Sequence, residues 1–506
     1  MQTTHNKWLT RSGARGQAPA VRISGSLNVR RHGLIIRMNI HKGQVFGNWT
    51  IQNHVKSGGN GSVYIVHNNS GVYNAIKILT KIKQTAYSRF KDEIKAIKDN
   101  CTIPGIIQIT DSYLPDKINK EDPPWYTMPI CISITSKLNN ESFLKIIIYF
   151  SKITYSLSLL HEKNIYHRDI KPDNLLVLDE IPLLADFGLV RFPEKDDLTG
   201  IKEVLGPKWT MAPEVRRCDD GIEWEAADIY SLAKTLWIII TKIAKGFDGQ
   251  YNKKSTLSIS NFIKGWFLEP LEELLEKATD NNPKNRPSSA IFYNELLSII
   301  KLNEKYEHRN PAEWISLQKN LFPGIIPTQV IWTELSDILN ILNILGSSES
   351  LNHMFFPGGG GLDLEGAYPS HENGCIELNC GYTEIIKPTR LIFQSFPGQY
   401  EWNYFRIETD GISPSGVYNN LTYDHEEVTE IAPCRYIARH YWDQGTYNGK
   451  PLPETARVVS RHFKGNFLIF QKTSEFNKSS VAYDDLWTKL SLDQFNEFIV
   501  GVITKK

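Results

Sequence analysis

The hydrophobic positions near the start of the chain lie in short runs that are separated by glycine and asparagine turns. This pattern is typical of β-strands joined by hairpins. The strand positions are Ile51, Val55, Val63, Ile65 and the run 75–79. Residues 84–99 follow with Phe90, Ile94 and Ile97 at helical spacing, which predicts a helix with one buried face.

The pattern becomes mainly helical from about Ser142, with one interruption by a loop- and strand-rich stretch from His161 to Glu214. The order of elements predicts an α+β fold with two lobes, a small β-rich lobe followed by a larger helical lobe. No internal repeat is visible along the chain.

A different pattern begins at about residue 303. Residues 330–345 predict one helix ended by a glycine, and the glycine-rich stretch 355–361 predicts a flexible joint or loop. The strands expected beyond it are 390–396, 402–407 and 467–472. Ser491 and Gln494 make a capping box for a last helix. We therefore expect a separate, mixed and β-rich C-terminal domain over 303–506.

The composition is that of a soluble globular protein: 506 residues, 41% hydrophobic and 22% charged, with a net charge of +1. This length predicts two or three domains. Without a strong basic excess, no nucleic-acid partner is expected. The six cysteines are scattered, and neither a membrane-spanning run nor a signal-peptide pattern is found. A cytoplasmic, reducing location is expected.

Residues 1–42 contain no acidic residue and carry eight lysines and arginines with glycines between them. This segment is interpreted as a disordered basic arm, because such sequence cannot bury a core. Two alternatives are open: an arm that binds an acidic partner, and a true start of the chain at Met38.

The densest group of chemistry-bearing residues is Tyr-His-Arg-Asp-Ile-Lys-Pro-Asp-Asn at 166–174. Asp-Phe-Gly follows at 186–188 and Met-Ala-Pro-Glu at 211–214. Phosphoryl transfer needs a proton acceptor, metal ligands and cations, and this stretch offers all three. In order and spacing, these motifs resemble those of the eukaryotic-type (Hanks-type) serine/threonine protein kinase family.

The resemblance implies a role for each polar residue of these motifs. Asp169 is expected to accept the proton of the substrate hydroxyl, and Lys171 to lie beside the γ-phosphate of ATP. Asn174 and Asp186 are expected to hold Mg2+. A lysine two residues after the catalytic aspartate is the serine/threonine pattern of the family. ATP and Mg2+ are thus the expected nucleotide and metal, and protein substrates the expected partners.

The upstream motifs agree with this resemblance. Ala75-Ile76-Lys77 resembles the strand whose lysine contacts the α- and β-phosphates, with Glu93 at the spacing of its partner. The glycine-rich loop, residues 56–63, has Lys56 where the family has its first glycine. The implied nucleotide-binding residues are Lys56, Ser57, Gly58, Gly59, Asn60, Gly61, Val63, Ala75, Lys77, Glu93 and Leu176. Among them, Val63 and Ala75 would cover the adenine from above and Leu176 from below.

Two further matches are structural. Asp228 resembles the buried acid that fixes the catalytic loop, and Arg286 resembles the arginine that pairs with Glu214. Both imply a complete kinase domain over 43–302. Two positions in the activation segment depart from the family: Pro207 replaces a threonine whose hydroxyl bonds the catalytic residues, and Thr210 replaces a tyrosine. These departures bear on substrate specificity and activity.

Regulation is also suggested by the motif. Arg168 precedes the catalytic aspartate, and such an arginine commonly pairs with a phosphate on the activation segment. Thr199 is the only hydroxyl between Gly188 and Gly206 and is the expected phosphorylation site.

The alternative to an active enzyme is a pseudokinase, a nucleotide-binding scaffold that acts through its C-terminal domain. The complete catalytic set favours the enzyme. A small-molecule kinase is disfavoured, because that class lacks these motifs. Residues 303–506 resemble no family, and we expect them to bind a protein or effector ligand. The aromatic residues Trp402, Tyr404, Tyr441 and Trp442 are interpreted as core. A zinc site at His371, Cys375, Cys380 and Cys434 is a weaker alternative.

Overall fold

The computed structural model describes most of the chain from residue 40 to residue 505. The described stretches are 40–57, 61–192, 209–348, 351–355, 361–370, 372–381, 383–410, seven short strands between 421 and 470, and 491–505. The predicted basic arm lies outside them except for its last residues, and Gly58, Gly59, Asn60, Thr199 and Pro207 lie outside them as well.

The first lobe is a six-stranded sheet with one helix beside it, as predicted. In sheet order its strands are β1 (Val45–Phe46), β2 (Trp49–Ser57), β3 (Gly61–His67), β4 (Tyr73–Leu79), β6 (Trp125–Met128) and β5 (Asp111–Tyr113). Helix α1 spans Gln84–Asp99, which matches the predicted range. Its predicted apolar face is buried, with Phe90, Ile94 and Ile97 each 3% exposed or less. The helical period was therefore a sufficient signal for this element.

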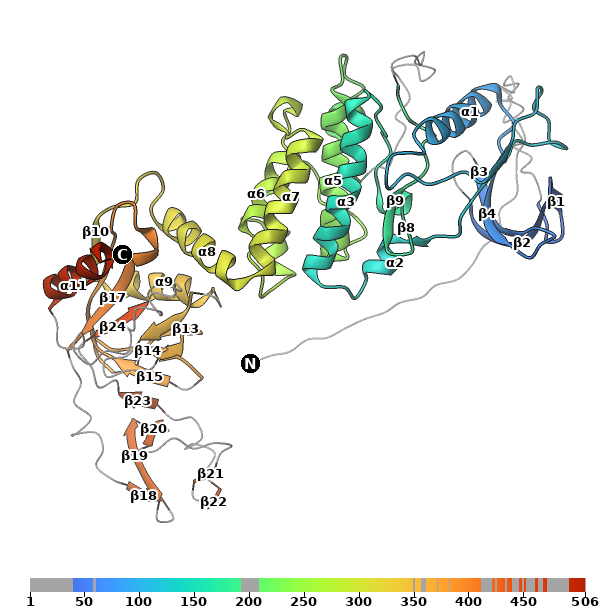
Figure 1. Ribbon diagram of the computed structural model, residues 1–506. Helices are drawn as coiled ribbons and strands as arrows, with labels where there is room; N and C mark the ends of the chain where they lie inside the picture. The colour runs from blue at the N-terminus through green and yellow to red at the C-terminus, as the bar shows by residue number, and fades with distance from the viewer. Residues whose placement is uncertain are drawn as a thin grey trace, which may run out of the picture.

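The second lobe is mainly helical. Its helices are α2 (Ile134–Leu138), α3 (Phe143–Glu162), α4 (Pro213–Arg217), α5 (Trp224–Thr241), α6 (Glu269–Ala278) and α7 (Ser289–Glu304). A small sheet of β7 (Ile132–Ser133), β8 (Leu175–Leu178) and β9 (Ile181–Leu184) lies at the boundary between the lobes. Figure 1 shows α3 beside α5 and α7, with β8 and β9 on the side that faces the first lobe.

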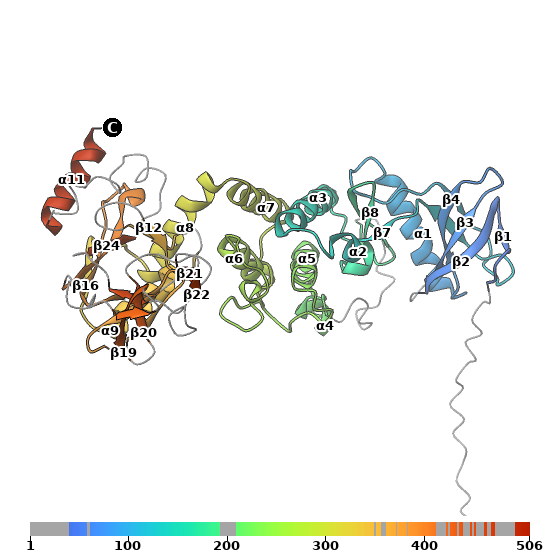
Figure 2. The ribbon, with the colours of Figure 1, turned by 90° about the horizontal axis from the view of Figure 1, so that it is seen from below.

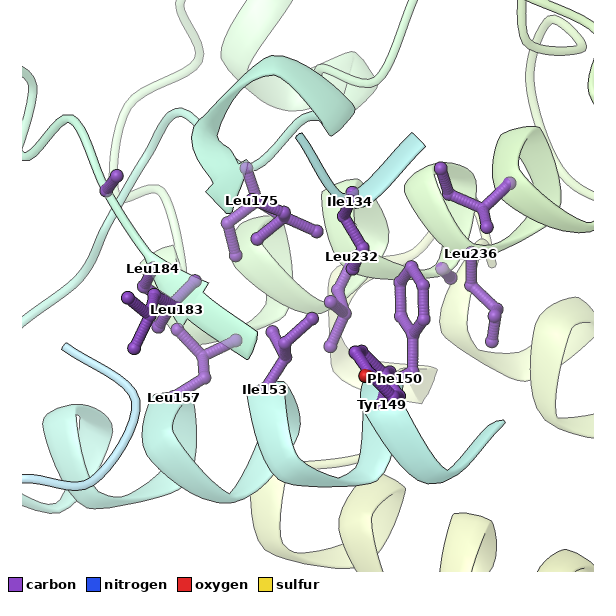
Figure 3. Packing of buried hydrophobic residues seen from close by; sticks show 14 of the residues in the cluster. Ile134, Tyr149, Phe150, Ile153, Leu157, Leu175, Leu183, Leu184, Leu232 and Leu236 are labelled. Atoms are coloured by element: carbon purple, nitrogen blue, oxygen red, sulfur yellow. The ribbon is translucent and has the colours of Figure 1, made fainter. Parts of the chain in front are cut away.

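Helix α3 is the centre of this lobe. Its residues Phe150, Ile153 and Leu157 are fully buried, and Figure 3 shows them pointing toward Leu232 of α5 and the leucines of β8 and β9. By length and composition α3 is apolar enough to span a membrane, but 67% of its most apolar window is buried inside the protein. Burial of that extent is what the central helix of a packed core shows.

Beyond α7 the chain forms α8 (Tyr306–Leu321) and then mostly strands. One six-stranded sheet has the order β10 (Gln329–Trp332), β16 (Pro388–Gln394), β17 (Tyr404–Thr409), β24 (Phe467–Phe470), β11 (His353–Phe355) and β12 (Gly361–Asp363). A second sheet has the order β13 (Gly366–Pro369), β14 (Ile376–Asn379), β15 (Thr383–Ile386) and β23 (Ser460–His462). Further short strands are β18 (Leu421–Tyr423), β19 (Glu426–Ala432), β20 (Arg435–Ala438), β21 (Thr446–Tyr447) and β22 (Lys450–Pro451).

This region has hydrophobic clusters of its own. One contains Trp314 of α8 together with buried residues up to Ile407. Another joins Trp402 and Tyr404 to the last helix, α11 (Leu492–Thr504). The core interpretation of these two aromatic residues is confirmed, since both are at most 1% exposed. The capping box at Ser491 and Gln494 is confirmed as well.

One predicted helix was wrong at its start. Residues 329–332 form the strand β10, and α9 begins only at Leu335 and ends at Gly346. The reason is a long-range contact: Val330 pairs with Phe393 across the sheet, and the local helical pattern does not reveal that neighbour. The strands on either side of the predicted glycine-rich joint, β11 and β12, pair with each other in one sheet, and residues 356–360 between them lie outside the described residues.

Figures 1 and 2 show the small lobe, the helical lobe and the β-rich C-terminal region in a row, with α8 after α7 at the junction. Asn303, at the predicted boundary, lies in the last turn of α7, and its side chain bonds both backbone groups of Phe267. Among the described residues, no group of three or more histidine, cysteine, aspartate or glutamate side chains is placed to hold a metal ion. Of the four residues in the alternative zinc set, Cys375 and Cys380 are buried in the described part of the chain, and His371 and Cys434 lie outside it.

Candidate active site

A buried ion-pair cluster lies between the two lobes. The Nζ atom of Lys77, on β4, is 2.6 Å from Oε1 of Glu93 on α1 and 3.0 Å from Oδ1 of Asp186. Burial alone would lower the pKa of Lys77, but the charges of Glu93 and Asp186 outweigh it and hold this pKa well above its ordinary value. Lys77 is therefore a permanent cation, and the sequence-predicted pairing of Lys77 with Glu93 is present.

Asp186 remains an anion beside this lysine. Its pKa is lowered, first by the charge of Lys77, although burial acts in the opposite direction. Its side chain is 42% exposed, so that a ligand from the cleft can reach it. Asp186 also has a φ of +64°, a left-handed conformation that aspartate seldom adopts and that the packing around it must maintain.

The catalytic loop brings Asp169, Lys171 and Asn174 together. Oδ2 of Asp169 accepts hydrogen bonds of 2.8 Å from both the Lys171 ammonium and the Asn174 amide. The other carboxylate oxygen, Oδ1, is buried and has no hydrogen-bond partner among the described residues. Burial raises the pKa of Asp169, and Lys171 partly opposes that rise. One oxygen of a fixed, buried carboxylate is thus left to accept a proton.

Asp228, on α5, fixes this loop from below as the sequence resemblance implied. Its two oxygens accept backbone N–H bonds from His167 and Arg168, at 2.7 and 2.8 Å, and it is 1% exposed. Arg168 has a φ of +66°, so that the loop needs this support to hold its turn. His161 of α3 contacts Oδ2 of Asp228 at 3.1 Å.

An apolar stack links the loop to the first lobe. The rings of His167 and Phe187 lie 4.8 Å apart, and Phe187 and Ile97 of α1 are both fully buried in one hydrophobic cluster. The same cluster contains Val63 and Ala75 from the strands above the cleft, with Leu176 packed against it from β8. The three predicted adenine-contacting residues therefore come from both sides of the cleft.

The glycine-rich hairpin is described except for residues 58–60. A Cβ at Gly61 would lie 2.6 Å from the carbonyl oxygen of Ile78, so glycine is required there by the neighbouring strand. Ser57 and Ser62 bond across the hairpin at 2.9 Å. Lys56, which replaces the first family glycine, reaches over the cleft, and its Nζ donates to the Asp173 carbonyl at 3.3 Å.

The substrate-facing side contains residues that sequence reasoning did not assign. Oγ1 of Thr210 donates a 3.0 Å hydrogen bond to the carbonyl of Ile170, the residue between Asp169 and Lys171. Thr210 is 2% exposed, so this bond fixes the end of the activation segment to the catalytic loop. The family pattern could not predict this bond, because the family has a tyrosine where this chain has Thr210.

A cavity of about 410 Å³ opens beside this contact. It begins at Lys171, Pro172 and Asp173 of the catalytic loop, and its far wall comes from α2 and the end of α5. The remaining lining residues are Thr135, Leu138, Asn139, Trp209, Thr210, Ile238, Ile239, Lys242 and Ala244. Lys171 therefore both bonds Asp169 and lines this cavity.

The lobe is completed by a buried ion pair, as predicted. Arg286 donates two hydrogen bonds to the two oxygens of Glu214, at 2.7 and 3.0 Å, and its side chain is fully buried. Two parallel bonds of this kind fix both position and orientation. The end of the activation segment is thereby fastened to the base of the helical lobe.

The donor atoms fit a magnesium ion. Asp186 offers an ionised, partly exposed carboxylate, and both hydrogen bonds of the Asn174 side chain use its Nδ2, which leaves the amide oxygen for a ligand. Oxygen donors of this type, completed by phosphate oxygens and water, are what Mg2+ prefers.

The comparisons with known proteins agree with this geometry. Residues 49–299 match the model of the protein kinase domain family. The serine/threonine-protein kinase ppk34 of Schizosaccharomyces pombe is 32% identical over 168 residues, 31% of this chain and 44% of that protein. The CBL-interacting serine/threonine-protein kinase 24 of Arabidopsis thaliana is 31% identical over 143 residues, 27% of this chain and 31% of that protein.

A longer alignment connects this chain to the dual specificity protein kinase shkB of Dictyostelium discoideum. The two are 26% identical over 301 residues, 53% of this chain and 42% of that protein. This chain thus spans less than half the length of each of these three relatives. With the motifs, the ion pairs and the family match in agreement, residues 49–299 are a protein kinase domain of the Hanks type.

Proposed function

We propose that this protein is an ATP- and Mg2+-dependent kinase that phosphorylates serine or threonine hydroxyls of protein substrates. The observation that carries the proposal is the state of Asp169. One of its oxygens is fixed by Lys171 and Asn174, and the other is buried without a partner among the described residues. A substrate hydroxyl is the group that such an oxygen can receive.

The reaction follows from the residues around that carboxylate. The substrate hydroxyl oxygen forms a bond to the γ-phosphorus, the bond from that phosphorus to the β–γ bridging oxygen breaks, and the hydroxyl proton goes to Asp169. Lys171 neutralises charge on the transferred group, and Lys77 orients the remaining phosphates. Mg2+, held by Asn174 and Asp186, would supply further charge neutralisation on the phosphate oxygens.

Transfer of label from radiolabelled ATP to a generic protein tests this proposal. We expect Mg2+-dependent labelling on serine or threonine, lost when EDTA is added. Asp169→Asn should lower turnover by a factor on the order of 100 to 10,000 and leave ATP binding intact, because Lys77 and Asp186 are untouched. Asp220→Asn, at an exposed aspartate of the same lobe, is the matched control. Equal turnover by wild type and Asp169→Asn would contradict the role of Asp169.

The second candidate function is a pseudokinase scaffold. The departure at Pro207 favours it, because that position lacks the hydroxyl that the family uses. It is disfavoured by the complete set of Lys77, Glu93, Asp169 and Asp186. Tight ATP binding without any labelling of protein, by wild type and Asp169→Asn alike, is the outcome that supports the scaffold.

We also propose that residues 303–506 form a separate domain that binds a protein or effector. Its support is the pair of hydrophobic clusters that contain no residue of the kinase core. Arg309, in the first half of α8, contacts the kinase lobe, where it donates a 2.6 Å hydrogen bond to the Gly265 carbonyl. A region with its own hydrophobic core is suited to recruitment.

Truncation tests this second proposal. A protein that ends at Glu304 keeps the whole of α7 and should remain soluble and label a generic substrate at the wild-type rate. Its labelling of cellular targets should fall. If this protein instead unfolds, and residues 303–506 alone capture no specific ligand, the region is a structural extension of the lobe.

A further inference from the structure

The buried cluster of Lys77, Glu93 and Asp186 has a further hydrogen-bonding partner that no sequence motif reveals. The hydroxyl of Tyr126, on β6, donates a 2.8 Å hydrogen bond to Oε1 of Glu93. That oxygen is the same one that receives the Lys77 ammonium at 2.6 Å. One carboxylate oxygen therefore binds a charge and a hydroxyl at once, inside a site where all three residues are at most 8% exposed.

The strand register explains how this contact arises. Lys77 and Tyr126 are directly opposite each other in the antiparallel pair of β4 and β6. Opposite residues in such a pair project from the same face of the sheet, and here that face is covered by α1. The ring of Phe90, three residues before Glu93 in α1, packs 5.5 Å from the Tyr126 ring. Tyr126 thus holds α1 by a ring contact and a hydrogen bond.

We propose that Tyr126 is a positioning residue, which holds Glu93 and α1 in the arrangement that pairs Lys77 before ATP binds. The inference rests on the proposed kinase function. Its physical basis is that burial of a hydroxyl is unfavourable unless it is hydrogen-bonded, and this hydroxyl bonds only the nucleotide-site carboxylate among the contacts of the described residues. A phenylalanine would fill nearly the same volume, so packing alone does not explain why a hydroxyl is present at this position.

The test is Tyr126→Phe, which removes one oxygen and keeps the ring. Glu93 should then be held by Lys77 alone, and α1 should sample other positions. We expect the KM for ATP to rise and kcat to fall, by about tenfold together in kcat/KM, while the KM for the protein substrate stays unchanged. A fall in kcat with both KM values unchanged would show a merely structural role and overturn the proposal.

Tyr149→Phe is the matched control. Tyr149 is also 1% exposed, and its hydroxyl also donates to a glutamate, Glu180 at 2.6 Å, but it lies on α3 away from the nucleotide. Its KM for ATP should equal that of the wild type. In a double-mutant cycle, Tyr126→Phe should have little further effect in a Glu93→Gln background. Independent, additive effects would contradict an action through Glu93.

Binding of Mg2+-ATP, measured on the same proteins by calorimetry, separates this inference from the proposed function. If the wild type transfers no phosphate but Tyr126→Phe still weakens ATP binding, the positioning role stands and the kinase function fails. If the wild type is active and Tyr126→Phe binds ATP normally, the positioning role is wrong. Should Tyr126→Phe unfold, Tyr126→Met replaces it, and normal ATP affinity in that variant likewise overturns the proposal.

Discussion

The nucleotide-facing and substrate-facing sides of the cleft differ in how closely they follow the family. On the nucleotide side, Lys77 and Glu93 are paired as the resemblance implied, and Asp186 also contacts Lys77. On the substrate side, Pro207 and Thr210 replace the usual residues, and Thr210 forms its own bond to the catalytic loop. A triphosphate always needs the same charges, whereas protein substrates differ, so the second side has more freedom to vary.

The largest effect is expected from a substitution on the nucleotide side. Lys77→Met removes the cation from a buried cluster and leaves the Glu93 carboxylate, 1% exposed, without its charge partner. Loss of one partner from such a pair costs about 3–5 kcal/mol. We expect activity and ATP affinity to fall together by a factor of at least about 100. Calorimetry with Mg2+-ATP and the labelling assay measure the two quantities.

Asp169→Asn provides the contrast to Lys77→Met, because it should lower labelling by a factor on the order of 100 to 10,000 while ATP affinity stays within about twofold. If both variants lost ATP affinity equally, the division of the cleft into two sides would be wrong. In that case Asp169 would contribute to nucleotide binding through Asn174, which contacts it at 2.8 Å.

The next largest effect is expected from removing the Thr210 hydroxyl on the substrate side. Thr210→Val keeps the shape of the side chain but removes the donor to the buried carbonyl of Ile170, which costs about 1–3 kcal/mol when left unpaired. We expect kcat/KM for the protein substrate to fall about tenfold with the KM for ATP unchanged. Thr235→Val is the control, since Thr235 is also buried and its hydroxyl donates to the Ser231 carbonyl of its own helix. A rise in the KM for ATP would mean that Thr210 acts on both sides.

The residues that the structure brings together at the candidate site could be predicted from sequence because each lies in a short motif with its own spacing. Asp169, Lys171 and Asn174 fall within six residues of chain, and local turn geometry brings them together. Asp228 and Arg286 were also identified correctly, although their partners are far away in the chain. Asp228 lies 61 residues from His167, and Arg286 lies 72 residues from Glu214. For these two the family pattern supplied the long-range contact that local sequence does not contain.

The residues that were missed depend on contacts between distant segments. Tyr126 reaches Glu93 only because β6 pairs with β4 in one particular register. A shift by one residue would turn it to the other face of the sheet. The strand at Val330 was likewise hidden, because its partner β16 lies some sixty residues later in the chain. Period and propensity describe neighbours along the chain and not neighbours across a sheet.

The smallest expected effect concerns the cavity on the substrate side. Among its described lining residues, Lys171 and Lys242 are cations and Asp173 is a carboxylate, and Leu138, Ile238 and Ile239 form apolar walls. Lys242 is exposed, so its interaction with a substrate charge is screened and worth about 0.3–1 kcal/mol. Lys171 is already paired with Asp169, so among the described lining residues Lys242 is the cation that can attract an acidic side chain next to the phosphorylated hydroxyl, and we expect a preference for such substrates.

Charge reversal at Lys242 tests this preference without touching the catalytic groups. For peptides with an acidic residue beside the serine, Lys242→Glu should lower kcat/KM about two- to fivefold relative to peptides with a neutral residue. Because the interaction is between exposed charges, the difference should shrink at high salt. Lys245→Glu introduces the same charge three residues later, at an exposed position outside the cavity lining, and should leave the preference unchanged. If Lys245→Glu shifts the preference as much as Lys242→Glu does, the effect comes from the net charge of the lobe, and the cavity does not select the substrate.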